Sequence, residues 1–205
     1  MLAKLTVKEF FENTASAGPV PGGGTIAALS AAAASSLVEM VANLTIGKKG
    51  YGEVEEGMKA ISRQASRYRD KLVQDVDNDS DAYKQVMAAF RLPKRTEEEI
   101  TYRKEAIETA LKNAALVPLS VAKDASNLID LAGETITKGY KTAVTDAVVA
   151  AVTARSAGLS ALYNVKINLS SIKDRSFIHD VSQQISHLEN EIRRKEKQVL
   201  SKSDL

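Results

Sequence analysis

One aspartate stands where the hydrophobic pattern of the sequence calls for an apolar side chain. Between residues 54 and 90, apolar residues recur in alternating steps of three and four, and Asp79 falls on this stripe between Val76 and Tyr83. A carboxyl group on the buried face of a helix loses its water, which disfavours the charged form and raises the pKa. Because such a group exchanges protons near neutral pH, the pattern indicates that Asp79 is a general acid/base.

Three further aspartates lie within four residues of Asp79. Asp75 lies one turn earlier near the same face, and a second carboxylate there is expected to raise the proton affinity further. Asp77 and Asp81 fall off the stripe and are expected to be solvated. A structural alternative stays open, in which Asp79 pairs with an arginine or caps a neighbouring helix.

A triple glycine next to a proline is the second unusual feature. Pro21, Gly22, Gly23 and Gly24 lead into a segment rich in alanine and serine, residues 26–46. Glycines adopt backbone angles closed to other residues and leave amide groups bare where a helix begins. Bare amides at the positive end of a helix dipole suit a phosphate or carboxylate. The alternative is a tight turn that lets a small-residue helix pack closely.

Other chemistries find little support in the sequence. Lys48 and Lys49 follow Gly47, but the first glycine and the magnesium-binding hydroxyl of a nucleotide-hydrolase loop are missing. The two lysines are expected either to bind an anionic ligand or to be solvated at the end of a helix. His179 and His187 are the only histidines, fit no zinc pair or triad, and are assigned to the surface. Cysteine is absent, which excludes thiolate catalysis and cysteine-ligated zinc. We predict no metal site and no tightly bound cofactor.

Length and composition predict one all-α domain over residues 1–205. The net charge is only +2 and both signs are mixed along the chain, which argues against a nucleic-acid partner. No signal peptide pattern opens the sequence. Residues 26–46 match a membrane span in length, but Glu39 and Asn43 favour a buried core helix. The expectation is a soluble cytoplasmic protein without a membrane partner.

The same patterns predict a bundle of about six helices, two of them long and two rich in small residues. Capping boxes open helices at Thr6 and Thr96, and Pro118 is expected to kink the helix that contains it. An amphipathic tail either folds back on its own domain or pairs with another chain. The expected helices cover residues 6–13, 26–46, 54–90, 96–138 and 145–163, and a tail from about 175 to 199.

Several short motifs, taken in order, resemble the formiminotetrahydrofolate cyclodeaminase and methenyltetrahydrofolate cyclohydrolase family, an all-helical domain. The resemblance runs from Thr6 to about Phe177. The motifs that carry it are Pro21-Gly22-Gly23-Gly24-Thr25, Met40-Val41-Ala42-Asn43-Leu44-Thr45 with Gly47-Lys48-Lys49 and Tyr51, Asp79 with Ala82-Tyr83, Val117-Pro118-Leu119, Thr145-Asp146-Ala147, and Asn164-Val165 with Ile167-Asn168-Leu169.

The resemblance implies a substrate, a set of site residues and an assembly. The substrate is a tetrahydrofolate adduct, and Asp79 exchanges a proton at its one-carbon unit. The resemblance also implies a homodimer in which the small-residue helices pack tightly. The residues that it implies for folate binding are Pro21, Gly22, Gly23, Gly24, Asn43, Lys48, Lys49, Tyr83, Asp146 and Asn164.

One segment departs from the family pattern. Tyr140-Lys141-Thr142 stands where the family usually has asparagines, whose amides would be natural ligand contacts. The sequence around Lys48 resembles the stand-alone cyclohydrolases slightly more than the cyclodeaminases. A catalytically silent dimer that binds folate or serves as a scaffold is the alternative function.

Overall fold

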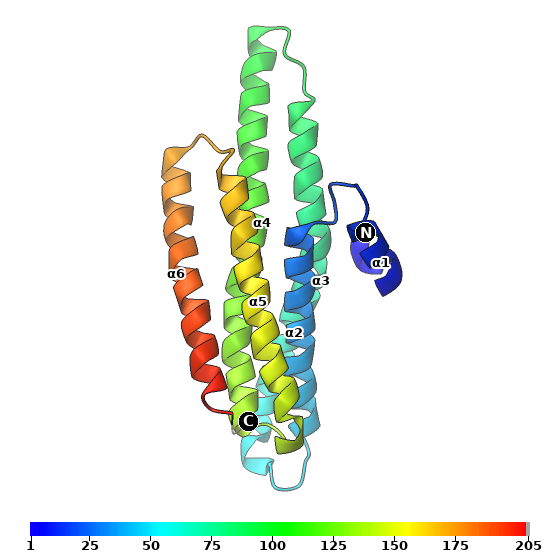
Figure 1. Cartoon of the computed structure of the whole chain (residues 1–205), viewed down its shortest axis with the longest axis vertical. Coiled ribbons are helices and arrows are strands. Elements are labelled where there is room, and N and C mark those ends of the chain that lie inside the picture. The colour runs from blue at the N-terminus through cyan, green and yellow to red at the C-terminus, as the bar shows by residue number, and fades with distance from the viewer. Residues whose placement is uncertain (204–205) are drawn as a thin grey trace.

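The computed structural model describes residues 1–203, which form six α-helices and three short 3-10 turns with no strand in this range (Figure 1). The all-α class expected from the sequence is therefore confirmed. The α-helices are α1 (Val7–Thr14), α2 (Gly23–Thr45), α3 (Glu55–Phe90), α4 (Glu97–Lys138), α5 (Val144–Leu169) and α6 (Arg175–Leu200). The 3-10 turns are η1 (Leu2–Lys4), η2 (Gly52–Val54) and η3 (Lys141–Ala143).

Helices α2, α3, α4 and α5 pack side by side as a bundle, and α6 folds back onto α4 and α5 (Figure 1). The tail therefore covers its own chain, which was one of the two alternatives. The turn η1 contacts α3, and the short helix α1 lies outside the bundle (Figure 1). The hairpin of α3 and α4 extends well past the first turn of α2, so the far end of this hairpin has fewer helices around it.

Both predicted capping boxes are confirmed. The Thr6 and Thr96 side chains accept hydrogen bonds from the backbones of Glu9 and Glu99, whose carboxylates bond back to the cap residues. Each box satisfies amide groups that a helix start otherwise leaves without partners.

Small residues let the central helices approach closely. Alanines are fully buried along both α2 and α5, where larger side chains would hold the helices apart. Within residues 1–203, α2 is the one helix long and apolar enough to cross a membrane. Since α2 packs on three helices and 56% of its apolar window is buried, it matches the core helix expected from the sequence.

Pro118 lies inside α4, which continues on both sides of it. Proline has no backbone N–H, so the carbonyl of Ala114, four residues earlier, lacks its usual helical partner. The Asn168 side chain of α5 donates a hydrogen bond to this carbonyl at 2.7 Å. The proline thus creates an acceptor on α4 that the end of α5 uses, which stabilises the contact between the two helices.

Three details differ from the sequence-based expectation. Helix α5 continues past Tyr163 to Leu169, because Val165 and Leu169 are buried and extend its packed face. Tyr83 and Phe90 lie on the predicted stripe of α3 but are 37% and 45% exposed, since α3 there extends beyond the start of α2 (Figure 1).

Candidate functional site

The carboxyl group of Asp79 lies directly against the first turn of α2. The Thr25 hydroxyl donates a hydrogen bond to Asp79 Oδ2 at 2.7 Å. A Cβ atom built on Gly24 would lie only 2.1 Å from Asp79 Oδ1, so only glycine leaves room for the carboxyl group at this position. The two features that the sequence singled out, the glycine run and the aspartate of the stripe, therefore meet in space.

The glycines also differ in detail from the expected loop. Gly22 is the cap residue of α2, and Gly23 and Gly24 belong to its first turn rather than to a loop before it. The cap residue has no side chain to bind the free amides of this helix start. The Asp79 carboxyl group of α3 lies at this helix start instead, bound by Thr25, and a carboxylate is stabilised at the positive end of a helix. Asp79 thus lies where the helix-cap alternative expects it, and the acid/base role of the same residue stays a prediction.

Burial raises the pKa of Asp79 above its ordinary value. Hydrogen bonds from Thr25 act in the opposite direction and offset part of this rise. The side chain is half-buried, so it combines lost hydration with remaining access from outside. This is the electrostatic setting of a carboxyl group that can hold a proton above its usual pH range.

The prediction that Asp75 adds to this shift is wrong. Asp75 is buried and accepts hydrogen bonds from Lys71 and Asn78, both at 2.9 Å. Lys71 also bonds Asp124 and Ser120 of α4. Lys71 thus neutralises Asp75 and ties α3 to α4, and Asp75 is not among the influences on the pKa of Asp79.

Asp77 is also not the solvated residue that the sequence predicted. It is half-buried, and its carboxylate accepts a hydrogen bond from the backbone N–H of Leu2 in η1. The other oxygen of Asp77 is buried without a partner in the described part of the chain. Asp77 therefore fastens the N-terminal turn to α3. Asp81 is exposed and pairs with Lys84, as expected of a surface residue.

Two other predicted residues lie at the same end of the bundle as Asp79. The Asn164 side chain of α5 lies beside Gly23, where a Cβ atom would approach its amide oxygen and nitrogen to 3.3 Å. Tyr83 lies one turn beyond Asp79 on α3 and is partly exposed. Pro21 is buried immediately before the glycines. Three helices, α2, α3 and α5, thus contribute to one cluster around the start of α2.

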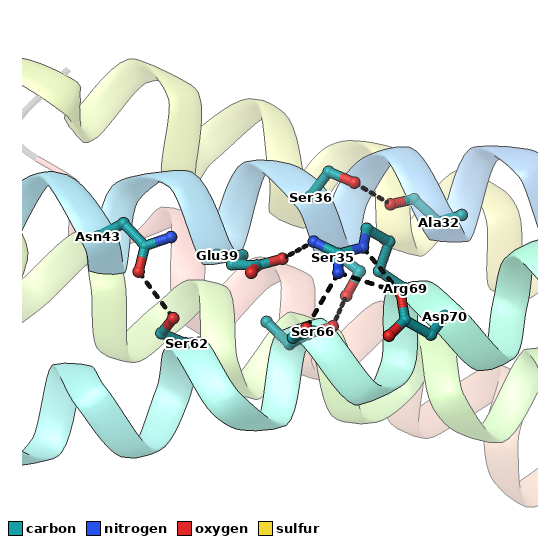
Figure 2. A network of polar contacts seen from close by, with 10 residues as sticks. Ala32, Ser35, Ser36, Glu39, Asn43, Ser62, Ser66, Arg69 and Asp70 are labelled. Atoms are coloured by element: carbon teal, nitrogen blue, oxygen red, sulfur yellow. Dashed lines mark hydrogen bonds and ion pairs between the residues drawn. The ribbon is translucent and has the colours of Figure 1, made fainter.

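The remaining predicted residues lie at the opposite end of the bundle. Asn43 lies nineteen positions after Gly24, which at about 1.5 Å per residue places them about 28 Å apart along α2. Figure 2 shows Asn43 accepting a hydrogen bond from Ser62 of α3 at 2.7 Å. Lys48 and Lys49 are exposed in the turn after α2, and Asp146 lies in the first turn of α5. One chain therefore does not gather all predicted residues into a single site.

The segment that departs from the family pattern closes this second end. The backbone N–H of Tyr140 donates to the Thr45 hydroxyl at 2.8 Å, and that of Lys141 donates to the Tyr51 hydroxyl at 3.1 Å. The ammonium group of Lys48 lies 4.1 Å from the centre of the Tyr140 ring. Tyr140 thus contacts the ammonium group of a lysine that the family resemblance assigned to folate binding.

Thr25 belongs to the site although the sequence did not mark it as a functional residue. It is fully buried and makes the hydrogen bond to Asp79 described above. Its place directly after the three glycines, in the first turn of α2, is the signal that could have identified it. His179 and His187 are exposed on α6, as predicted.

The raised pKa of Asp79 has a consequence for stability. Between the ordinary pKa of about 3.8 and the raised value in the folded state, the folded protein binds more protons than the unfolded chain, so stability falls as pH rises. Asp79→Asn removes this titration. We expect the free energy of unfolding of the wild type, minus that of the variant, to decrease with rising pH and then to level off. Urea unfolding of both proteins across this range measures it, and a difference that stays constant or increases contradicts the raised pKa.

Comparison with known proteins gives a consistent result. The model of the Formiminotransferase-cyclodeaminase family matches residues 6–187. The chain is 39% identical over 180 residues to a methenyltetrahydrofolate cyclohydrolase of Methylorubrum extorquens, covering 88% of this chain and 86% of that one. It is 33% identical to a formimidoyltransferase-cyclodeaminase of Gallus gallus, of which it spans 34%. A crystal structure of formiminotetrahydrofolate cyclodeaminase from Thermotoga maritima superposes with a TM-score of 0.88 at 31% identity, covering 98% of this chain and 97% of that chain.

Proposed function

Since the chain belongs to the formiminotransferase-cyclodeaminase family, we propose that it acts on the carbon that bridges N5 and N10 of tetrahydrofolate, with Asp79 as general acid/base. The observation that carries this proposal is the Asp79 carboxyl group, half-buried between Gly24 and Thr25 at a helix start. Hydrolysis of methenyltetrahydrofolate is the first candidate reaction, supported by the 39% identity to the bacterial cyclohydrolase over most of both chains. Ring closure of formiminotetrahydrofolate is the alternative, supported by the similarity to the Thermotoga maritima enzyme.

In the hydrolytic reaction, water attacks the electron-poor methenyl carbon. Ionised Asp79 accepts a proton from this water as the new C–O bond forms, which makes water a better nucleophile. The resulting tetrahedral centre collapses with cleavage of one C–N bond, and the departing folate nitrogen takes up a proton. The product carries a formyl group on the other nitrogen, and one proton is released to solvent overall.

In the deaminating reaction, the same carboxyl group works as an acid. The free folate nitrogen attacks the formimino carbon and forms a tetrahedral centre that carries the amine. Asp79 in its protonated form donates a proton to this amine, so that it leaves as ammonia and the methenyl ring closes. A raised pKa suits this direction, because it keeps more of the carboxyl group protonated near neutral pH.

The two groups of predicted binding residues suggest that two copies of the chain build one site. We propose a homodimer with a two-fold axis perpendicular to α2, which would bring Lys48 and Lys49 of one copy near Asp79 of the other. In this arrangement the glycines, Asn164 and Tyr83 surround the one-carbon unit. The lysines of the partner copy are then available for the carboxylates of the folate.

The exposed face shared by α2 and α5 is the surface proposed for this contact. The two helices lie side by side and run in opposite directions (Figure 1). Most of their charged residues point elsewhere, since Glu39 pairs with Arg69 of α3, and Arg155 and Lys166 pair with α6. Asp146 is half-buried in the first turn of α5. The face is formed mainly by apolar and small side chains, which suits a second copy of the same surface. Its exposed or half-buried residues are Ile26, Leu29, Ala33, Leu37, Met40, Leu44, Val149, Val152, Ser156, Leu159, Tyr163 and Ile167.

A charge placed on this face is expected to separate the two copies. Val149 is 51% exposed on α5, and Val149→Glu would put two like charges into a two-fold interface. We expect a folded monomer with little activity, measured by analytical ultracentrifugation and by helical circular dichroism. Val73→Glu is the matched control, because Val73 is 38% exposed on α3, away from the proposed face. A Val149→Glu protein that stays dimeric would show that this face is not the interface.

Complementation tests whether one site needs both chains. The Asp79→Asn variant and a Lys48→Ala/Lys49→Ala double variant are each expected to be weakly active alone. When they are co-refolded, half of the dimers are mixed, and each mixed dimer regains one intact site, so roughly a quarter of the wild-type activity returns. If each site lies within one chain, mixing restores nothing.

The reaction itself is tested by following the absorbance of methenyltetrahydrofolate. One assay starts from the methenyl compound and a second starts from formiminotetrahydrofolate, with ammonia measured in parallel. Accelerated loss of absorbance identifies the cyclohydrolase, and gain of absorbance together with ammonia identifies the cyclodeaminase. If neither reaction is accelerated, the proposed activity is wrong, and the silent folate-binding dimer takes its place.

A further inference from the structure

The two oxygens of the Asp79 carboxyl group have different surroundings. Oδ2 accepts the hydrogen bond from Thr25, whose side chain is fully buried between α2 and α3. Oδ1 accepts no hydrogen bond from any side chain between residues 1 and 203, and it is not among the buried unpartnered oxygens of this range. Since a carboxyl oxygen can accept more than one hydrogen bond and no side chain occupies Oδ1, this is the oxygen left for a ligand.

The position of Oδ1 depends on the missing side chain of residue 24. A Cβ atom there would lie 2.1 Å from Oδ1, 2.7 Å from the carboxyl carbon and 2.9 Å from Oδ2. Thr25 therefore holds one side of the carboxyl group, while Gly24 provides the space for the other. Neither contact alone fixes the orientation of a side chain that rotates about two bonds.

We propose that Thr25 is a positioning residue that binds Oδ2 of Asp79 and thereby assigns the exchange of the substrate proton to Oδ1. This inference rests on the proposed role of Asp79 and goes beyond it by naming the oxygen that reacts and the residue that selects it. A carboxyl group that cannot rotate presents the same oxygen in every turnover, which reduces the entropy lost in reaching the reactive geometry.

No charged group is among the influences on the pKa of Asp79, so Thr25 is the side chain that lowers it. The influences on the pKa of Asp79 are burial, which raises it, and hydrogen bonds from Thr25, which lower it. The first four turns of α2 contain no titratable side chain before Glu39, and the stretch of α4 from Asn113 to Ser120 contains none. Along α3, the nearest titratable groups are Asp77, which accepts from the Leu2 backbone, Asp81, which pairs with Lys84, Asp75, which Lys71 neutralises, and Tyr83. On α5 they are Tyr163 and Lys166, which pairs with Glu189.

Removal of the hydroxyl group at residue 25 is the direct test. Thr25→Val keeps the shape of the side chain but cannot donate to Oδ2, and Thr25→Ser keeps the donor. We expect the pKa of Asp79 to rise by about one pH unit in the valine variant, because a hydrogen bond to a charged group favours the ionised form. The serine variant should titrate like the wild type. The Asp79→Asn variant assigns the carboxyl signal in a carbon NMR titration.

A second buried hydroxyl group provides the matched control. Ser35 is fully buried on α2 and donates to the backbone carbonyl of Ala65 on α3 at 2.7 Å (Figure 2). Ser35→Ala removes a hydrogen bond between the same two helices, far from Asp79. It should lower the melting temperature without moving the titration of Asp79 or the pH profile of kcat.

The NMR titration needs no substrate, so this test can succeed or fail independently of the folate reaction. A pKa that rises in Thr25→Val, together with a pH profile of kcat that shifts by the same amount, supports the proposal. A titration of Asp79 that is identical in the valine variant and the wild type overturns it, and so does a shift of the same size in Ser35→Ala. If Thr25→Val does not fold, Thr25→Ala carries the same test with the same expected direction.

Discussion

Asp79→Asn is expected to lower kcat for the hydrolysis of methenyltetrahydrofolate by about 10²- to 10⁴-fold, the usual contribution of a general acid/base. Asparagine has nearly the same shape as aspartate, and its amide oxygen can still accept the hydrogen bond from Thr25. Its side chain cannot take up or release a proton in this pH range. The change therefore separates the proton transfer from the packing of α2 against α3.

The control for this prediction lies half a turn away on the same helix. Asp81→Asn removes an exposed carboxylate that pairs with Lys84, and it should leave kcat within about twofold of the wild type. Both variants should keep the helical circular dichroism of the wild type. An Asp79→Asn protein with nearly full activity would assign the residue to helix capping alone.

Gly24→Ala is expected to reduce kcat by about 10²-fold, although alanine is the better helix former. In the interior of a helix this exchange normally stabilises the protein by about 0.5–1 kcal/mol. Here the new methyl group would lie 2.1 Å from Asp79 Oδ1, well inside van der Waals contact, so the carboxyl group must move away. A displacement of about 1 Å at a reacting group outweighs the gain in helix propensity.

Gly57→Ala is the matched control for this glycine. Gly57 lies in the first turn of α3, and a Cβ atom there meets nothing within 4 Å. We expect unchanged activity and a melting temperature equal to or above that of the wild type. Gly24→Ala with normal activity would mean that the reacting group does not depend on the contact between Asp79 and Gly24.

Much of the fold could be predicted because its signals are local. The capping boxes at Thr6 and Thr96 and the stripe along α3 are set by residues three or four apart, and all three appear in the structure. The end of α5 could not be predicted from such signals, because no glycine or proline stops it near Tyr163. The burial of Val165 and Leu169, which extends this helix, is a tertiary contact.

In the candidate site, too, local features could be predicted from the sequence and contacts between distant residues could not. The stripe predicted the burial of Asp79, and the glycines predicted a special helix start, but their contact joins residues 54 positions apart. The hydrogen bond from Leu2 to Asp77 spans 75 positions and has no signature in the sequence. The pairing of Asp75 could have been anticipated, since Lys71 lies four residues earlier on the same helix. The separation of Asn43 from Gly24 follows from the length of α2 alone.

The most direct test of the account is a crystal structure of the protein with 5-formyltetrahydrofolate, a stable analogue of the one-carbon adducts. We predict that the formyl group binds at the start of α2, with Asp79 Oδ1 within about 3.2 Å of it or one water molecule away. The lysines that approach the carboxylates of the ligand should come from the second copy of the chain. A ligand whose one-carbon group lies away from Asp79, for example beside Tyr140 at the opposite end of the bundle, would contradict the account.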